Sequence, residues 1–476
     1  MREALAHSCA PICARPLLQA RYAGWRWAAA SGVITLAAAA LLVWRPPVQV
    51  GDQNPDADLQ VNSLPSGAAI EVDGRAYGRA PATIRLPAGE HRVTLRLDAH
   101  ADATYRIAAR RNETVTLDAE LWLQTPRVQR LRPIFPGATI ADARFLADGH
   151  VILLLALPGD ERELWLLDAD GLPQRLGPPE GRGALAASPD GQRVAYLARS
   201  ERADPRLDEL WLAAPDRANA ERWYQLGSTA ERLTDLSWAP SGERLLLVGL
   251  EQRTDGSVRT QLRVADAQGG EPRSLLGLPG EVVPSSYTWS PDGAQVAFLT
   301  RSGQHVALCL LDVQTGEFRY LADLSRDDST PLPIAPVAWS PDGRRLVYAA
   351  PAQDPTVPAL WPFGPKPPPA LFTTEAHTAV GQRLANATGQ SPAWRRDGTI
   401  VALARPDGSR PLVLRSVDAQ GESGDGSSLP LEAANTFAAR WDLAHAQAIV
   451  AVRSTNVFGG SQTDYWLVRF RAEEAP

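Results

Sequence analysis

The amino-acid sequence predicts an all-β protein whose main part is a seven-bladed β-propeller, with six blades as the alternative. Two observations support this prediction: a tight-turn motif recurs seven times along the chain, and a nearly continuous apolar strand follows it. A supersecondary unit that repeats at a near-fixed period cannot bury its faces alone, so it stacks on its neighbours. A small β-sandwich and one N-terminal transmembrane helix are predicted ahead of the propeller.

The repeat is most easily aligned on the residue that ends the strand before each turn. Those residues are Phe145, Ala187, Trp238, Trp289, Trp339, Trp394 and Trp441. Successive copies lie 42 to 55 residues apart. Proline, aspartate and glycine suit the successive positions of a type I turn and its exit. The turn residues predicted to be structural are Pro189, Asp190, Gly191, Pro291, Asp292, Gly293, Pro341, Asp342 and Gly343.

The strand after each turn is apolar on both faces. Residues 151–155 and 245–248 are examples, and such runs indicate strands that are covered on both sides. A second, weaker pair of strands follows each hairpin, which gives the four strands of a propeller blade. The seventh repeat has only three strands before the chain ends, so residues 128–131 are predicted to supply its fourth strand and to close the ring.

The Trp-Ser-Pro-Asp-Gly hairpins at 289–293 and 339–343 resemble the TolB-type, WD-like propeller repeat of bacterial envelope proteins. The resemblance covers roughly residues 125–472 and implies a propeller. It does not imply one function, since such propellers serve binding and enzymatic roles alike. The propeller domain is predicted to occupy residues 122–476.

Residues 27–44 carry no charge and are long enough to span a membrane as a helix. Trp27 and Trp44 suit the two membrane interfaces, and arginines are concentrated before the span. We therefore expect residues 1–26 to be cytoplasmic and the rest of the chain to be extracytoplasmic, with a single-pass anchor. A cleaved signal peptide is the alternative.

Residues 45–57 are rich in Pro, Gly, Gln and Asp, which predicts a linker. Residues 58–121 contain alternating strands separated by turn residues, which predicts the small sandwich. The turn Pro65-Ser66-Gly67-Ala68, with Val72-Asp73-Gly74 downstream, resembles the PEGA domain, which is named for a Pro-Glu-Gly-Ala turn. This resemblance implies a binding or spacer module and no catalytic residue.

Composition argues against several classes of function. The net charge of −6 disfavours a nucleic-acid surface. Seven scattered histidines and three cysteines show no metal-ligand spacing with a complete ligand set, so no metal or cofactor is expected. The sequence has no Gly-x-Ser-x-Gly nucleophile elbow. We therefore expect no enzymatic activity, with a propeller enzyme that has an axial site as an alternative.

Long loops are predicted on the rim opposite the Pro-Asp-Gly turns, which suggests a binding face there. The candidate rim residues are Arg202, Arg206, Arg253, Arg259, Arg326, Asp327, Asp328 and Trp361. The favoured function is a membrane-anchored envelope platform that binds a protein or a glycan. The alternative is an envelope sensor that relays ligand occupancy through its anchor helix.

Overall fold

The computed structural model describes residues 56–471, with gaps at 147, 159–161, 168–171, 176–180, 200–206, 215–219, 229, 280, 284–285, 303–304, 325–336, 351–368, 379–380, 406–411, 419–422, 425, 432–435 and 456–460. Every regular element in these residues is a β-strand, which confirms the predicted all-β class. The described residues contain no helix long and apolar enough to cross a membrane. The span predicted at 27–44 lies outside them.

Two sheets between residues 57 and 120 enclose one apolar core. The first sheet, in the order β4-β1-β7, contains β1 Ala57–Leu64, β4 Ala82–Leu86 and β7 Thr114–Glu120. The second, in the order β3-β2-β5-β6, contains β2 Ala69–Val72, β3 Arg75–Arg79, β5 Gly89–Arg96 and β6 Ala103–Ala109. Alternate side chains point inward, as Leu59 and Val61 of β1 and Val93 and Leu95 of β5 do. This arrangement is the sandwich that the alternating strands predict.

The described residues from Arg127 onward form seven more sheets, which we number 1 to 7 in chain order. Sheet 1 contains β9 Thr139–Phe145, β10 Val151–Ala156, β11 Arg162–Leu167 and β12 Pro173–Arg175. Sheet 2 contains β13 Gly181–Ala187, β14 Val194–Arg199, β15 Asp208–Ala213 and β16 Ala220–Gln225. Sheet 3 contains β17 Glu231–Trp238, β18 Arg244–Gln252, β19 Val258–Asp266 and β20 Arg273–Pro279.

The remaining four sheets follow the same antiparallel order. Sheet 4 contains β21 Glu281–Val282, β22 Thr288–Trp289, β23 Gln295–Ser302, β24 His305–Asp312 and β25 Phe318–Asp323. Sheet 5 contains β26 Val337–Trp339, β27 Arg345–Ala350, β28 Ala370–Glu375 and β29 Gly381–Thr388. Sheet 6 contains β30 Gln390–Trp394, β31 Ile400–Ala404, β32 Leu412–Val417, β33 Ser423–Gly424 and β34 Ser428–Leu429. Sheet 7 contains β35 Thr436–Asp442, β36 Gln447–Thr455, β37 Ser461–Arg469 and β8 Arg127–Leu131.

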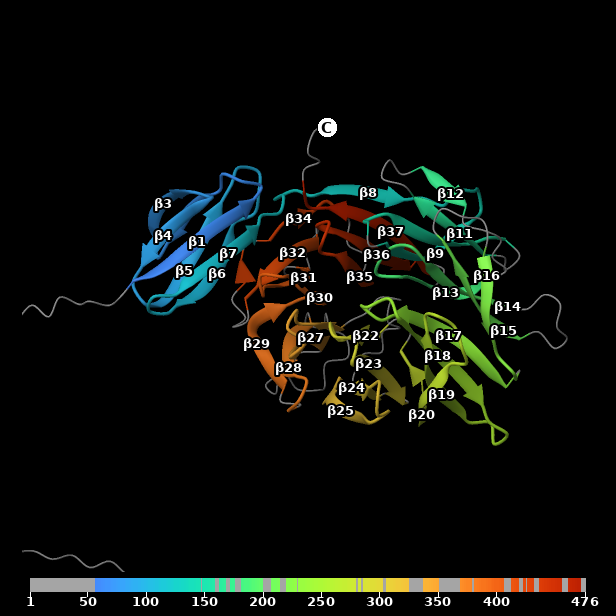
Figure 1. Cartoon of the computed structure of the whole chain (residues 1–476). Helices are drawn as coiled ribbons and strands as arrows, with labels where there is room; N and C mark the ends of the chain where they lie inside the picture. The colour runs from blue at the N-terminus through green and yellow to red at the C-terminus, as the bar shows by residue number, and fades with distance from the viewer. Residues whose placement is uncertain are drawn as a thin grey trace, which may run out of the picture. The chain divides into compact units, whose positions relative to one another are not determined.

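The seven sheets follow one another around a common centre, which we call the axis (Figure 1). The strand that pairs with both the first and the third strand of a sheet, which we call its second strand (β23 in sheet 4), is deeply buried. Residues 152–155 of β10 and 245–248 of β18 are examples. Neighbouring sheets cover both faces of these strands, so the strands carry no polar face. The apolar clusters accordingly draw residues from two neighbouring sheets. In one of them, Leu247 of sheet 3 is buried together with Ala195 of sheet 2.

The Pro-Asp-Gly turns are held by one repeated set of hydrogen bonds. In sheet 2 the Ser188 hydroxyl donates to Asp190 Oδ1 at 2.5 Å, and the Arg193 N–H donates to Ser188 Oγ at 2.9 Å. The Ser188 hydroxyl thereby lowers the pKa of Asp190. Gly191 has a φ of 67°, a backbone conformation that residues other than glycine rarely adopt. The same serine-to-aspartate bond recurs in the turns that begin at Ser290 and Ser340.

The two ends of the seven-sheet region pair with each other. Strand β8 forms an antiparallel ladder with β37, in which Leu131 lies opposite Tyr465 and Arg127 opposite Arg469. Leu131 is buried in the cluster shared by sheets 7 and 1. The strand predicted at 128–131 to complete the last repeat is therefore confirmed.

Replacing the buried Leu131 by alanine tests how much the packing of the closing strand β8 stabilises the protein. We expect Leu131→Ala to lower the free energy of unfolding by about 2–5 kcal/mol, because it leaves a cavity where β8 packs on sheet 1. The exposed neighbour Arg132 provides a control, and Arg132→Ala should change that energy by no more than about 0.5 kcal/mol. Urea unfolding of both variants measures the difference. Equal midpoints for the two variants would show that the packing of Leu131 between sheets 7 and 1 contributes nothing.

Candidate functional site: an arginine-lined axial cavity

In sheets 3, 4, 5 and 7, tryptophans at the ends of the first strands contact the first strand of the preceding sheet. Their indole N–H groups donate to main-chain carbonyls, Trp238 to Ala186 at 3.0 Å, Trp289 to Ser237 at 3.3 Å, Trp339 to Thr288 at 3.2 Å and Trp441 to Ser391 at 2.7 Å. An indole combines a large apolar area with one donor. At this position it fills the space between two first strands and satisfies a carbonyl at the same time.

Sheets 1 and 2 lack this tryptophan and have Phe145 and Ala187 in its place. A cavity of about 220 Å³ lies among the ends of the first strands of sheets 1, 2, 3 and 7. Its wall includes Arg144, Ala187, Ser237, Trp238, Arg440 and Trp441. One water needs only about 10–15 Å³ of such space, so the cavity has room for a group of several atoms. The missing indole at Ala187 accounts for its position.

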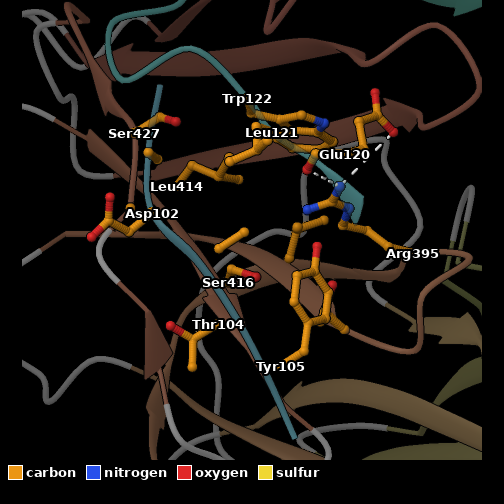
Figure 2. Close-up of a pocket in the computed structure, with 15 residues that line it drawn as sticks. Asp102, Thr104, Tyr105, Glu120, Leu121, Trp122, Arg395, Leu414, Ser416 and Ser427 are labelled. Carbon is orange, nitrogen blue, oxygen red and sulfur yellow. Dashed lines mark hydrogen bonds and ion pairs between the residues drawn. The ribbon is translucent and has the colours of Figure 1, made fainter. Parts of the chain in front are cut away.

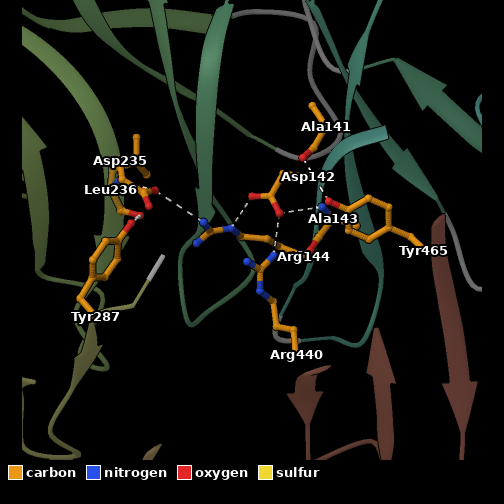
Figure 3. Close-up of polar contacts among 9 residues, drawn as sticks. All are labelled: Ala141, Asp142, Ala143, Arg144, Asp235, Leu236, Tyr287, Arg440 and Tyr465. Carbon is orange, nitrogen blue, oxygen red and sulfur yellow. Dashed lines mark hydrogen bonds and ion pairs between the residues drawn. The ribbon is translucent and has the colours of Figure 1, made fainter. Parts of the chain in front are cut away.

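The carboxylate of Asp142 on β9 holds both arginines of the cavity wall (Figure 3). Arg144 Nε donates to Asp142 Oδ2 at 3.0 Å, and Arg440 Nη1 donates to Oδ1 at 2.9 Å. The main-chain N–H of Ala143 also donates to Oδ1, at 2.9 Å. Burial alone would raise the pKa of Asp142, but Arg440 and Arg144 outweigh burial and lower it. The carboxylate is therefore ionised near neutral pH and fixes the direction of both guanidinium groups.

A second buried carboxylate extends this network to sheet 3. Arg144 Nη2 lies 3.6 Å from Asp235 Oδ1, and the N–H of Leu236 donates to the same oxygen at 2.9 Å. Beside them the Tyr287 hydroxyl donates to the Leu236 carbonyl at 3.1 Å, and burial raises the pKa of Tyr287 above its usual value. Arg144 reaches from sheet 1 to sheet 3 because the intervening strand β13 presents small residues such as Ala186.

The cavity faces the positive members of this cluster. Arg144 and Arg440 line it, whereas neither Asp142 nor Asp235 is among its lining residues. The exposed fractions agree, at 14% and 18% for the two arginine side chains against 8% and 5% for the two aspartates. The site therefore presents two cations to a ligand and keeps their counter-charges behind them. No set of three or more His, Cys, Asp or Glu side chains in the described part of the chain is placed to hold a metal ion.

The rim residues expected from the sequence lie elsewhere or outside the described residues. Arg253 is exposed in the turn between β18 and β19, and Arg259 is half-buried on β19. Both lie near the end of sheet 3 opposite Trp238, so they are not part of the axial cavity. The other rim candidates, outside the described residues, are Arg202, Arg206, Arg326, Asp327, Asp328 and Trp361.

A second, much smaller cavity lies where the sandwich meets sheet 6 (Figure 2). Trp122, just after β7, stacks on Phe470 with ring centroids 4.4 Å apart, and the Arg395 guanidinium lies 4.7 Å from its ring centroid. Arg395 Nη2 also donates to the Glu120 carbonyl at 2.6 Å. On the sandwich side the Tyr105 hydroxyl donates to Asp397 at 3.1 Å, and burial raises its pKa.

The contact between the sandwich and sheet 6 is a packed interface and leaves little space for a ligand. Its cavity of about 30 Å³ has room for only two or three waters, at about 10–15 Å³ each. Trp122 belongs to the same apolar cluster as residues of sheets 6 and 7. The sandwich is therefore fastened to the seven-sheet region by a buried aromatic ring and charged contacts, and the axial cavity remains the candidate ligand site.

Comparison with known proteins supports a TolB-like propeller that carries a PEGA domain. Residues 57–124 match the PEGA domain family. Over 76 residues the chain is 34% identical to the Tol-Pal system protein TolB of Albidiferax ferrireducens, which is 16% of this chain and 17% of that protein. The match thus spans less than a fifth of the relative's length.

Solved structures resemble the chain at low sequence identity and at TM-scores below 0.5. An oligogalacturonate lyase in complex with manganese has a TM-score of 0.49 at 13% identity, over 73% of this chain and 97% of its own. TolB from Acinetobacter baumannii has a TM-score of 0.35 at 14% identity, over 69% of this chain and 80% of its own. Likeness at this level reflects the fold alone.

The expectation that the chain has no enzymatic activity is corrected by these comparisons. Besides the lyase, they include an acylaminoacyl peptidase of Pyrococcus horikoshii, with a TM-score of 0.43 at 14% identity over 68% of this chain and 50% of its own. Enzymes therefore occur among the proteins of similar fold. The missing nucleophile motif excluded one hydrolase mechanism and could not exclude catalysis in general.

Asp142→Asn tests the charge balance of the axial cluster. We expect it to lower the free energy of unfolding at pH 7 by about 3–5 kcal/mol, because two buried cations lose their shared counter-charge. The folded-state pKa of Asp142 is lowered, so its contribution is complete above the unfolded pKa of about 3.9 and is lost as the pH falls through the folded value. The difference between the variant and the natural protein should therefore shrink in acid.

The exposed Asp98 provides the matched control for this variant. Asp98→Asn should change the free energy of unfolding by no more than about 0.5 kcal/mol at either pH. Urea unfolding at pH 7 and at pH 3 measures both variants. A difference for Asp142→Asn that is as large in acid as at neutral pH would contradict the assigned ionisation.

Proposed function

We propose that the chain is an extracytoplasmic binding protein of the bacterial envelope, in which a propeller recognises a partner protein. The observation that carries this proposal is the axial cavity, where Arg144 and Arg440 face an accessible space inside a rigid ring of sheets. A rigid scaffold with a concave, charged site is typical of recognition modules. The TolB relative and the PEGA match support an envelope location.

The proposed organisation has five parts. The seven sheets are the blades of a seven-bladed propeller within residues 122–476, and residues 58–121 are the PEGA domain. Residues 45–57 are the linker to a transmembrane helix at 27–44, which leaves residues 1–26 in the cytoplasm. The pairing of β8 with β37 supports seven blades, because it lets the seventh sheet reach four strands and closes the ring without a further unit.

The rim opposite the turns is proposed as a second contact surface for the same partner or for a glycan. Arg253 and Arg259 on one hairpin of sheet 3 belong to it. Because this rim and the axial cavity lie at opposite ends of the first strands, contacts at the two places can be separated by experiment.

Site-specific photo-crosslinking in living cells tests this proposal. A photoreactive amino acid is placed at Ser237, which lines the cavity, and separately at Arg253 on the rim. We expect a discrete protein adduct from Ser237, and from Arg253 if the rim also binds, because a specific partner places the same residues beside the probe in every complex. Denaturing gels and mass spectrometry identify the adducts.

A position on the exposed face of the PEGA domain, Thr116, provides the background control. Adducts that are equally strong from Thr116 and from both test positions would indicate nonspecific labelling. If Ser237 and Arg253 give no specific adduct, the chain does not bind a partner protein through either end of the axis.

A further inference from the structure

The pattern of residues around the axis indicates which chemical group the cavity binds. One position before the aligned tryptophan, successive first strands carry Arg144, Ala186, Ser237, Thr288, Ala338, Ala393 and Arg440. Five of these side chains are small and uncharged. The two arginines belong to sheets 7 and 1, which are neighbours in the ring because they share one apolar cluster. The positive charge of this layer is therefore concentrated on one side of the cavity.

We propose that this cavity binds a single carboxylate group of the partner protein, an inference that rests on the proposed function. Guanidinium groups match the planar, two-oxygen geometry of a carboxylate. Arg144 and Arg440 both donate hydrogen bonds to Asp142, so the directions of their guanidinium groups are fixed before the partner binds. Such preorganisation reduces the entropy lost on binding.

The charge balance of the cluster favours one negative charge over two. Asp142 and Asp235 already oppose the two arginines, so the four side chains together are formally neutral. A monoanion would contact the arginines directly and keep the aspartates at a greater distance. A phosphate dianion would feel twice the attraction to the arginines and twice the repulsion from the aspartates, so a formally neutral cluster gives its second charge no net gain. The dianion would also lose more hydration free energy than a monoanion on entering a poorly solvated site. The structure thus favours a carboxylate over a phosphate.

The rest of the cavity wall is mostly apolar, which matches the aliphatic part of a side chain that ends in a carboxylate. The rings of Phe145, Trp238 and Trp441 and the methyl group of Ala187 supply apolar surface beside the two guanidinium groups. A glutamate side chain or a chain terminus joins an apolar stem to a carboxylate in the same way. The cavity is therefore large enough for one acidic end group of a polypeptide and is matched to it in polarity.

Ligand-detected NMR with the full chain in detergent tests the proposal with four probes. At pH 8, N-acetyl-glutamic acid amide presents a side-chain carboxylate, N-acetyl-alanine a terminal carboxylate and N-acetyl-glutamine amide a neutral analogue, and inorganic phosphate is mostly a dianion. We expect at least one carboxylate probe to bind at least tenfold more tightly than the glutamine probe and than phosphate. The tighter carboxylate probe identifies whether a side chain or a chain end is the source.

Variants at Ser237 place the binding in the cavity without removing either arginine. Ser237→Asp brings a negative charge to the wall and should weaken carboxylate binding at least tenfold, whereas Ser237→Asn adds similar bulk and should weaken it less. Thr116→Asp adds the same charge to the exposed face of the PEGA domain, away from both proposed contact surfaces, and should leave binding within about twofold. Thermal unfolding confirms that each variant is folded.

Three results would overturn the proposal: equal binding of the glutamate and glutamine probes, tighter binding of phosphate, or identical affinities for Ser237→Asp and Ser237→Asn. These failures are distinct from failure of the proposed function. Specific crosslinks from Ser237 without carboxylate selectivity would mean that the protein binds a partner but recognises a different chemical group. Carboxylate binding without any crosslinked partner would instead mean that the cavity binds a small molecule and not a partner protein.

Discussion

The structure depends on the mutual covering of neighbouring sheets in a closed ring. The second strands are apolar on both faces, so a sheet that lost one neighbour would expose apolar surface to water. Pairing of β8 with β37 makes the last sheet as complete as the others and joins the two ends of the region. The covering explains why similar residues recur, because successive sheets meet the same packing problem and four of them solve it with the same indole contact.

Function becomes possible where this repetition is interrupted. Most first strands end in an indole that closes the space next to the axis, and Ala187 leaves that space open. Two other departures, Arg144 and Arg440, place charge beside the opening, and Asp142 and Asp235 make that charge tolerable in a buried setting. The scaffold positions are thus similar from sheet to sheet, while the exceptions gather on adjacent sheets and form the site.

Much of the fold follows from the sequence because it is encoded locally. The Ser-Pro-Asp-Gly turns, the apolar second strands and the closing strand at 128–131 are all visible in short segments. The axial site could not be found that way, because Asp142, Asp235 and Arg440 are far apart in the chain and ordinary in their local context. Aligning the repeats around the tryptophan would have shown arginine at a position that is otherwise small. The sequence favours the rim instead, because loop length is visible in a sequence and the convergence of side chains at an axis is not.

The cavity exists because sheet 2 has no indole at the end of its first strand, and a crystal structure of Ala187→Trp would test this cause. We expect the introduced indole to lie between the first strands of sheets 1 and 2, to donate its N–H to a main-chain carbonyl of β9, and to remove most of the 220 Å³ space. An indole turned outward to solvent, with the cavity unchanged, would contradict this explanation.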